Sequence, residues 1–218
     1  MNLKHAIATR ARVLATLSLL GLLTPLLSQA YPGQEGAIPW LLDLTTHWQW
    51  IYLTGLILFG LLAALGDRRW LVLLLAFPLP WVTPAPAAMP ATGPGALLSV
   101  MSANLHLDNA EAQPLRALLA RERPDVVVLL ELSPDYARQL EGLEAYPYRE
   151  LAPDYGPFGI GLLSQLPLNG VRVVHDQDGV ARIEANLDHA GQTVRLIAFH
   201  PMPPIEPRFH AQRNAMLE

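Results

Sequence analysis

Two long stretches of the chain carry no charged side chain and consist mainly of apolar residues. They run from residue 13 to 34 and from residue 44 to 66. The apolar core of each is close to the roughly 20 residues that an α-helix needs to cross the hydrocarbon layer of a membrane. We therefore predict two transmembrane helices in the first part of the chain. A buried helix in a soluble core is the alternative interpretation of these segments.

A third apolar segment, from residue 70 to 82, is short for a membrane span. Pro78 and Pro80 disturb a helix near its end, because proline lacks the backbone N–H and its ring clashes with the preceding turn. The uncharged residues that follow can extend the segment, so it can still cross the membrane. We predict a membrane region over residues 1–82 with two to three transmembrane helices, and hence the lipid bilayer as a partner.

The basic residues of this region form two clusters. Lys4, Arg10 and Arg12 precede the first predicted helix, and Arg68 and Arg69 lie between the second and third. The loop between the first two helices contains no Lys or Arg. By the positive-inside rule both clusters face the cytoplasm, so three crossings place the rest of the chain outside the cytoplasmic membrane.

The first apolar segment has a second interpretation. Ser28, Gln29 and Ala30 at its end resemble the small-residue cleavage site of a signal peptide. Cleavage after Ala30 leaves two spans and the same final topology.

Residues 83–97 are uncharged and rich in Pro, Ala and Gly, which predicts an extended, semi-rigid linker. Beyond it, residues 98–218 carry ten basic and sixteen acidic side chains, a net charge of −6. This charge disfavours bulk, nonspecific binding to nucleic acid. The chain has no cysteine, so disulfides, zinc–thiolate sites and cysteine nucleophiles are excluded.

The pattern of residues 98–218 predicts an α/β domain with the order β-α-β-α followed by further strands. A short apolar strand ends at Asn104, and the next helix has Asp108 or Asn109 available as its N-cap and Pro124 as its stop. A second helix begins with Ser133 as N-cap and Pro134 at its first position. The last two strands form a hairpin through the turn at residues 189–191.

Three of the predicted apolar strands end in polar residues, Asn104, Glu131 and His200. Strand ends that open on the same side of an α/β sheet line a crevice. The oxygens of Asn104 and Glu131 suit Mg²⁺ or Mn²⁺, and a nearby histidine can steady a phosphate oxygen or accept a proton. Taken singly, each residue also has a structural explanation. His106 can approach the same place, although a strand-end loop residue is the favoured interpretation.

Four motifs carry a resemblance to a known family: SANLH around Asn104, VVVLLELS around Glu131, FGIGLLSQLPL at 158–168 and IAFHPMPP around His200. In their order and spacing, residues 97–218 resemble the endonuclease/exonuclease/phosphatase superfamily. Its members include pancreatic-type deoxyribonuclease, abasic-site endonucleases, inositol polyphosphate phosphatases and bacterial sphingomyelinases. The apolar prefix and the H-P-x-P-P run with Arg213 and Asn214 behind it resemble a membrane-anchored bacterial subgroup.

The resemblance implies N-terminal transmembrane helices followed by part of a four-layered α/β sandwich, two stacked mixed β-sheets flanked by helices. It implies that Asn104 and Glu131 help to bind a catalytic Mg²⁺ or Mn²⁺ ion and that His200 assists at the scissile phosphate. The expected substrate is a phosphoester: a small phosphodiester, a lipid headgroup or a nucleic acid. Arg213 can bind a phosphate of that substrate, since arginine suits bidentate phosphate contacts; a solvated helix arginine is the alternative.

Two motifs of the superfamily, a later Gly-Asp-x-Asn and a final Ser-Asp-His, do not occur in the 218 residues. We therefore expect the sequence to be a fragment or the product of a truncated gene, inactive and poorly folded as it stands. The implied activity is that of a metal-dependent phosphoesterase in the bacterial cytoplasmic membrane with an extracytoplasmic catalytic domain. The alternative is a noncatalytic membrane-anchored interaction module.

Overall fold

The computed structural model describes residues 3–31, 35–82 and 97–217. The chain divides into two compact units, one comprising Met1–Pro90 with Met202–Glu218 and the other Ala91–Pro201. Apart from Leu97, the predicted linker lies outside the described residues.

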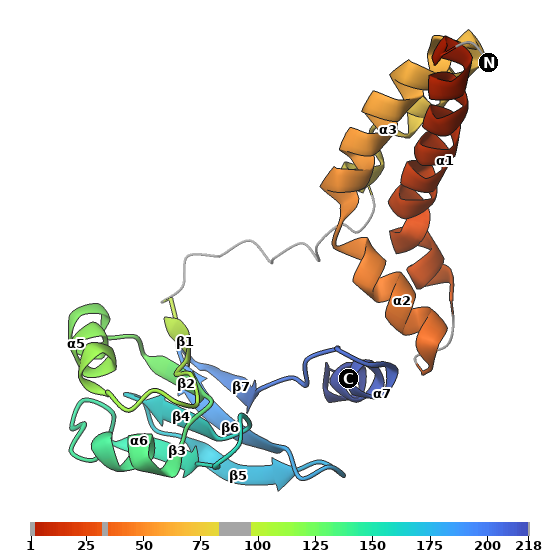
Figure 1. The fold of residues 1–218 in the computed structure, drawn as a ribbon. Helices are drawn as coiled ribbons and strands as arrows, with labels where there is room; N and C mark the ends of the chain where they lie inside the picture. The colour runs from red at the N-terminus through yellow and green to blue at the C-terminus, as the bar shows by residue number, and fades with distance from the viewer. Residues whose placement is uncertain (1–2, 32–34, 83–96, 218) are drawn as a thin grey trace. The chain divides into compact units, whose positions relative to one another are not determined.

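The first unit is helical (Figure 1). Its elements are α1 (Leu3–Ala30), α2 (Ala37–Thr46), α3 (Gln49–Ala64), the 3₁₀ helix η1 (Arg68–Ala76), α4 (Leu79–Val82) and α7 (Pro207–Leu217). Helices α1 and α3 lie side by side, with Leu22, Leu53 and Leu56 buried between the elements of this unit. A Cβ atom on Gly21 would lie 2.5 Å from the ring of Tyr52, so glycine at this position allows the close approach of α1 to α3.

The second apolar stretch mainly forms α3, and its first three residues end α2, a helix that also covers part of the loop predicted between the first two spans. Helices α2 and α3 are bent by 72° at the intervening break. Just before that break the hydroxyl of Thr45 donates to the carbonyl oxygens of Leu41 and Leu42, and the hydroxyl of Thr46 donates to that of Asp43. Such bonds compete with the helical ladder and favour a bend. The third apolar stretch is divided as the prolines predict, between η1 and α4.

Among the described helices, α1 alone is long and apolar enough to cross a membrane, over His5–Ala30. Helices α2 and α3 meet the same criterion only as one bent span. A signal sequence or a buried core helix near the N-terminus meets it as well. The helices therefore confirm one apolar N-terminal helix and leave the multi-pass topology and the bilayer partner as predictions.

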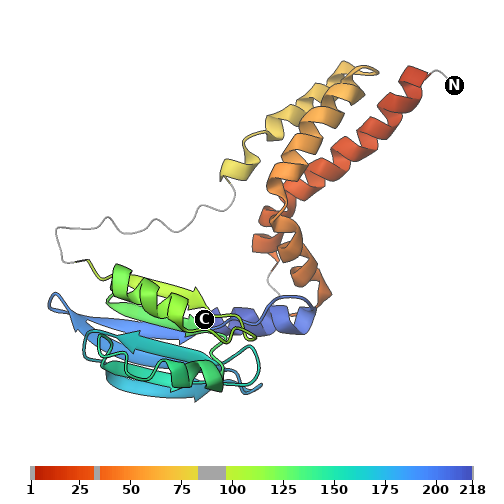
Figure 2. The ribbon, with the colours of Figure 1, turned by 60° about the vertical axis from the view of Figure 1, so that its left-hand side comes forward.

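The second unit contains two β-sheets (Figures 1 and 2). Its elements are β1 (Val100–Asn104), α5 (Gln113–Glu122), β2 (Val126–Leu130), α6 (Pro134–Gln139), β3 (Tyr148–Ala152), β4 (Ile160–Ser164), β5 (Asn169–His175), β6 (Ala181–His189) and β7 (Gln192–Phe199). One sheet has the order β1-β2-β4-β3, with β1 and β2 parallel and the other pairs antiparallel. The other is antiparallel, with the order β5-β6-β7. The predicted α/β fold with two sheets and flanking helices is thus confirmed in outline.

Strand β2 separates two hydrophobic cores. Val127 and Leu129 pack with α5 and α6 on one face of the sheet. Val126, Val128 and Leu130 pack with residues of β5, β6 and β7 on the other face. A strand covered on both faces needs a continuous apolar run, which is the pattern of this segment.

The ends of several elements follow their sequence signals. The Ser133 hydroxyl accepts a hydrogen bond from the Tyr136 amide, as predicted for an N-cap. The β6–β7 hairpin turns at Ala190 and Gly191, whose φ angles of 50° and 77° suit a tight two-residue turn.

One expectation about local structure was wrong. Helix α5 is not capped by Asp108 or Asn109, because it begins at Gln113 and Ala112 is its N-cap. The side chain of Asn109 instead accepts a hydrogen bond from the Glu111 amide, which closes a turn before the helix. Strand β3, which was not predicted, pairs with β4 at one edge of the first sheet.

One buried carboxylate of the second sheet, that of Glu184, lies between three arginine side chains. The Glu184 side chain on β6 is 6% exposed and forms ion pairs with Arg172 at 2.7 Å, Arg182 at 2.9 Å and Arg195 at 3.3 Å. The hydrogen bonds from Arg172 and Arg182 lower the pKa of Glu184 to about 2. The carboxylate is therefore charged in the folded protein at neutral pH.

Candidate functional site

The candidate site lies where β1 and β2 end. The two strands are parallel and pair Asn104 with Leu130, so Asn104 stands beside the residue that follows β2. That residue is Glu131. The Asn104 amide nitrogen donates a hydrogen bond of 2.7 Å to Glu131 Oε1. The structure thus brings together the two residues predicted as metal ligands.

The turn after β1 holds both side chains. The His106 amide donates to Asn104 Oδ1 at 2.9 Å, and the Leu107 amide donates to Glu131 Oε2 at 2.9 Å. His106 and Glu131 have φ angles of 63° and 58°, in the left-handed region that residues other than glycine rarely adopt. Such a strained backbone conformation persists where contacts with neighbouring residues hold it in place, and it is frequent at functional sites.

The hydrogen bond from Asn104 lowers the pKa of Glu131 below its ordinary value, and the bond from the Leu107 amide and the charges of His200 and His106 act in the same direction. Partial burial opposes these effects without reversing them. Glu131 is consequently an ionised, half-buried carboxylate. An ionised carboxylate beside an amide oxygen is the chemistry that hard divalent cations prefer.

His200 follows β7 directly, and its Nδ1 lies 2.9 Å from the carbonyl oxygen of Pro157. A carbonyl oxygen can only accept, so Nδ1 carries a hydrogen and Nε2 is the nitrogen left to accept or donate a proton. The ring of Phe158 lies beside the imidazole, with 5.9 Å between the ring centroids.

The loop that contacts His200 is joined to the end of β2. The Leu132 amide donates to the Gly159 carbonyl at 2.9 Å, and the Asp154 amide donates to the Leu132 carbonyl at 3.1 Å. A Cβ atom on Gly159 would lie 2.0 Å from the Leu132 carbonyl oxygen. Glycine at this position thus permits the contact between the loop and the segment that carries Glu131.

The described residues contain no group of three or more His, Asp or Glu side chains arranged to hold a metal ion. Asn104 and Glu131 supply one amide oxygen and one carboxylate. Mg²⁺ usually retains several waters and takes only one or two protein carboxylates, so the pair fits part of such a ligand set. Metal binding at this pair remains a prediction.

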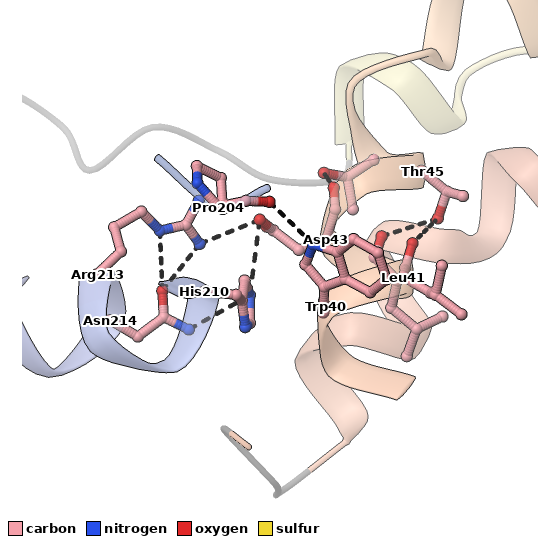
Figure 3. A network of polar contacts seen from close by, with 10 residues as sticks. Trp40, Leu41, Asp43, Thr45, Pro204, His210, Arg213 and Asn214 are labelled. Atoms are coloured by element: carbon pink, nitrogen blue, oxygen red, sulfur yellow. Dashed lines mark hydrogen bonds and ion pairs between the residues drawn. The ribbon is translucent and has the colours of Figure 1, made fainter. Parts of the chain in front are cut away.

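Arg213, the predicted phosphate ligand, lies on α7 in the helical unit. Its Nη2 donates to Asp43 Oδ2 at 3.0 Å, and its Nε and Nη2 both donate to Asn214 Oδ1 (Figure 3). Its role toward substrate remains a prediction. Sequence reasoning did not connect Arg213 with Asp43, which lies 170 positions earlier in the loop predicted between the first two spans.

The two-sheet α/β fold and the polar residues at its strand ends define a domain of the phosphoesterase type. The sequence model of the Endonuclease/Exonuclease/phosphatase family matches residues 101–217, more than half of the chain. The chain belongs to that family. No curated protein matches its sequence.

Solved structures with similar folds include the following three. A Danio rerio TDP2 humanized by 14 mutations is 25% identical with a TM-score of 0.41, covering 46% of this chain and 48% of that one. A truncated Caenorhabditis elegans TDP2 is 18% identical with a TM-score of 0.46, covering 55% and 51%. The 3′ phosphatase NExo from Neisseria, bound to a product DNA hairpin, is 18% identical with a TM-score of 0.42, covering 56% and 50%. The present chain spans about half the length of these relatives.

Proposed function

We propose that the chain contributes the metal-binding part of a divalent-metal-dependent phosphoesterase. The reaction class is that of a phosphodiesterase, nuclease or phosphatase. The observation that carries this proposal is the hydrogen-bonded pair of Asn104 and Glu131 at the ends of two parallel strands. Family membership supports the same class of chemistry.

Asn104 and Glu131 are the residues that would hold Mg²⁺ or Mn²⁺. When bound, the ion supplies positive charge that stabilises the developing negative charge of the phosphoryl group. Glu131 contributes the negative charge that attracts the ion. Asn104 and the amides of His106 and Leu107 fix the orientation of both ligands before the ion arrives.

His200 acts on the substrate phosphate in this proposal. Its Nδ1 is held by the Pro157 carbonyl, so Nε2 is the atom that donates a proton or a hydrogen bond to a phosphate oxygen. The hydrogen bond to the Pro157 carbonyl fixes the tautomer and orients the ring, and it does not involve Nε2.

The proposal includes a membrane tether. Lys4, Arg10 and Arg12 lie in the first part of helix α1, and Arg68 and Arg69 precede the third apolar segment. By the positive-inside rule, three crossings of a bacterial cytoplasmic membrane then deliver the catalytic domain outside. We take residues 1–82 as the membrane region, 83–97 as the linker and 98–218 as part of the catalytic domain.

The net charge of −6 over residues 98–218 favours a small phosphodiester or a lipid-borne phosphate over duplex DNA. A salt series on substrate binding separates these substrates, because each phosphate contact to a nucleic acid adds to the salt dependence of affinity. A shallow dependence supports the smaller substrate, and a steep one favours nucleic acid.

The test of the activity is hydrolysis of bis(p-nitrophenyl) phosphate, with Mg²⁺ or with EDTA, by a version of the protein that also carries the Gly-Asp-x-Asn and Ser-Asp-His motifs, since we expect the 218-residue chain alone to be inactive. The proposal predicts hydrolysis that requires the metal and is lost in Glu131→Gln. Glu144→Gln, which makes the same change on an exposed side chain, is the matched control. Hydrolysis that persists in EDTA or in Glu131→Gln contradicts the assigned site. A chain that binds no Mg²⁺ and hydrolyses no phosphoester favours the noncatalytic interaction module.

A further inference from the structure

Helix α1 contains a proline in its interior, and this proline leaves one backbone carbonyl without its helical donor. In a regular α-helix the amide of residue 25 donates to the carbonyl of Gly21, but Pro25 has no N–H. The helix nevertheless continues to Ala30. The Gly21 carbonyl therefore needs a hydrogen-bond donor from a side chain, above all in apolar surroundings.

Two side chains supply donors to this carbonyl. The buried hydroxyl of Thr24 donates to the Gly21 carbonyl at 2.7 Å from within α1. Gln49, the first residue of α3, donates from its Nε2 to the same carbonyl at 3.1 Å, and this nitrogen lies 3.5 Å from Thr24 Oγ1. The polar group that Pro25 frees in α1 is thus bound by a side chain of α3.

The buried face of α1 consists mainly of small residues at regular intervals of three and four positions. These residues are Ala8, Ala11, Ala15, Ser18 and Leu22. Such spacing is typical of the seam between two packed helices, and small residues let the backbones approach closely. Gly55 of α3 faces this seam, because a Cβ atom on Gly55 would lie 2.6 Å from Ser18 Oγ.

The larger apolar side chains of this helix pair lie on its outside. Val13, Leu17 and Leu20 of α1 are exposed, and so are Ile51 and Leu58 of α3. In a helix pair surrounded by water we expect the opposite arrangement, with the large apolar residues inside. Small and polar residues inside with large apolar residues outside suit a helix pair surrounded by lipid.

A removable signal peptide needs only an apolar core and small residues before its cleavage site. It has no need of a periodic small-residue face or of a partner for a freed carbonyl. Loss of residues 1–30 would leave the Gln49 amide on an apolar helix without its two oxygen partners in α1, which is costly in lipid. The candidate cleavage site at Ser28–Ala30 is also helical, whereas proteolytic cleavage concentrates in exposed loops.

We propose that α1 is a permanent partner of α3 in the mature protein and not a signal peptide, and that Gln49 recognises the carbonyl freed by Pro25. The inference deepens the membrane tether of the proposed function and rests on that tether for its lipid surroundings. It does not depend on phosphoesterase activity. All the contacts that carry it lie in the helical unit.

The mass of the full chain, extracted from a bacterial membrane through a C-terminal tag, tests whether α1 is retained. We expect a protein that still contains residues 3–30. The processing control is the same chain with residues 1–30 replaced by a cleavable signal peptide, which should lose that segment. A tagged protein that begins at Tyr31 would overturn the proposal.

A disulfide cross-link tests the packing of the two helices in the same membranes. A Cβ atom on Gly55 would lie 3.6 Å from Ser18 Cβ, which is within the range of disulfides, and the chain has no other cysteine. After oxidation, Ser18→Cys/Gly55→Cys should keep the two parts of the chain joined when a protease site inserted after Tyr31 is cleaved. Leu17→Cys/Gly55→Cys, with the exposed neighbour of Ser18, is the matched control and should separate. Equal cross-linking of the two pairs, or none in the Ser18 pair, would contradict the packing.

The match between Gln49 and Pro25 is tested by the equilibrium constant for forming this disulfide in a glutathione buffer. Gln49→Leu should lower the constant about 3-fold, the usual effect of one hydrogen bond between membrane helices. In a Pro25→Ala background the same change should have no effect, because the amide of residue 25 then donates to Gly21. Thr54→Val, which removes an exposed hydroxyl bonded within α3, is the control and should leave the constant unchanged. An equal loss in both backgrounds would refute the match.

The outcomes also separate this inference from the proposed function. A chain that hydrolyses no phosphoester leaves all three measurements unaffected. A chain recovered from the soluble fraction with residues 3–30 intact would refute the membrane tether, while the cross-link would still decide whether α1 pairs with α3.

Discussion

The Asn104 amide donates a hydrogen bond of 2.7 Å to the carboxylate of Glu131 across the ends of two parallel strands. Asn104 also accepts from the His106 amide, and Glu131 from the Leu107 amide. Both side chains are therefore held in one orientation by their own strand-end turn. Two side chains held in this way would lose little conformational entropy on binding the ion that we propose.

Glu131→Gln should weaken Mg²⁺ binding by at least about 10-fold, because a neutral amide replaces an ionised carboxylate of equal size. Calorimetric titration with Mg²⁺ measures this directly, with Glu144→Gln as the control. Equal Mg²⁺ affinity in Glu131→Gln and the parent would refute the ligand assignment.

In a version of the protein that also carries the two later motifs, His200→Ala should leave Mg²⁺ affinity unchanged and reduce turnover by about 10²- to 10⁴-fold if the imidazole is a general acid or base. His200→Asn is the sharper variant, because its amide nitrogen can replace Nδ1 as donor to Pro157 but nothing replaces Nε2. We expect both variants to lose turnover equally in steady-state assays. Near-normal turnover in His200→Asn would assign His200 a role in holding the loop only.

Gly159→Ala should destabilise the second unit by about 2 kcal/mol or more, because the new Cβ would meet the Leu132 carbonyl oxygen at 2.0 Å and the Asp154 amide nitrogen at 2.6 Å. Gly156→Ala is the matched control in the same loop, since its nearest neighbour is a side-chain oxygen of Asp154 at 3.0 Å. Denaturant unfolding of the two variants should separate them. Equal stability would contradict the close approach at Gly159.

The lowered pKa of Glu184 should make the stability of the folded protein depend on pH. Its pKa is about 2 in the folded protein against an ordinary value of 4.5, so the folded state binds the proton more weakly than the unfolded state. The stabilisation is complete above pH 4.5 and is lost as the pH falls toward 2. Thermal unfolding should show a lower Tm for Glu184→Gln at pH 7 and a difference that shrinks between pH 5 and about 2. A Tm difference independent of pH would show that Glu184 acts through packing alone.

The predicted topology is tested by reporter fusions placed after Gly95. Three crossings put this point outside the cytoplasmic membrane, so a periplasm-dependent alkaline phosphatase should be active there. A reporter active only in the cytoplasm, such as β-galactosidase, should be silent. The opposite pattern would indicate that the third apolar segment does not cross.

The strands with long apolar runs were predictable because each is buried on at least one face. Strand β3 was not, since Tyr148 and Arg149 at its start are exposed and its only strand neighbour is β4. The insertion of β4 between β2 and β3 also has no local signal, because strand order depends on contacts between distant segments. Helix α2 was not predicted, because most of it lies in the segment interpreted as the loop between the first two spans.

At the site, the sequence indicated Asn104, Glu131 and His200 because polar residues at the ends of apolar strands need partners. It did not indicate the Pro157 carbonyl, since a backbone group carries no side-chain signal. The positive φ of Glu131 was also beyond prediction, because it depends on the turn that follows β1. Asp43 is separated from Arg213 by 170 positions, and only the folded helices reveal that contact.

The connectivity of the site also sets an order of assembly. Asn104 and Glu131 are separated by only 27 positions and are joined by one β1-α5-β2 unit, whereas the bond between Pro157 and His200 spans 43 positions farther along the chain. Contacts between nearby residues form faster than distant ones, and the N-terminal part of a chain is synthesised first. We expect the nascent polypeptide to bring Asn104 and Glu131 together while the strand that precedes His200 is still inside the ribosome.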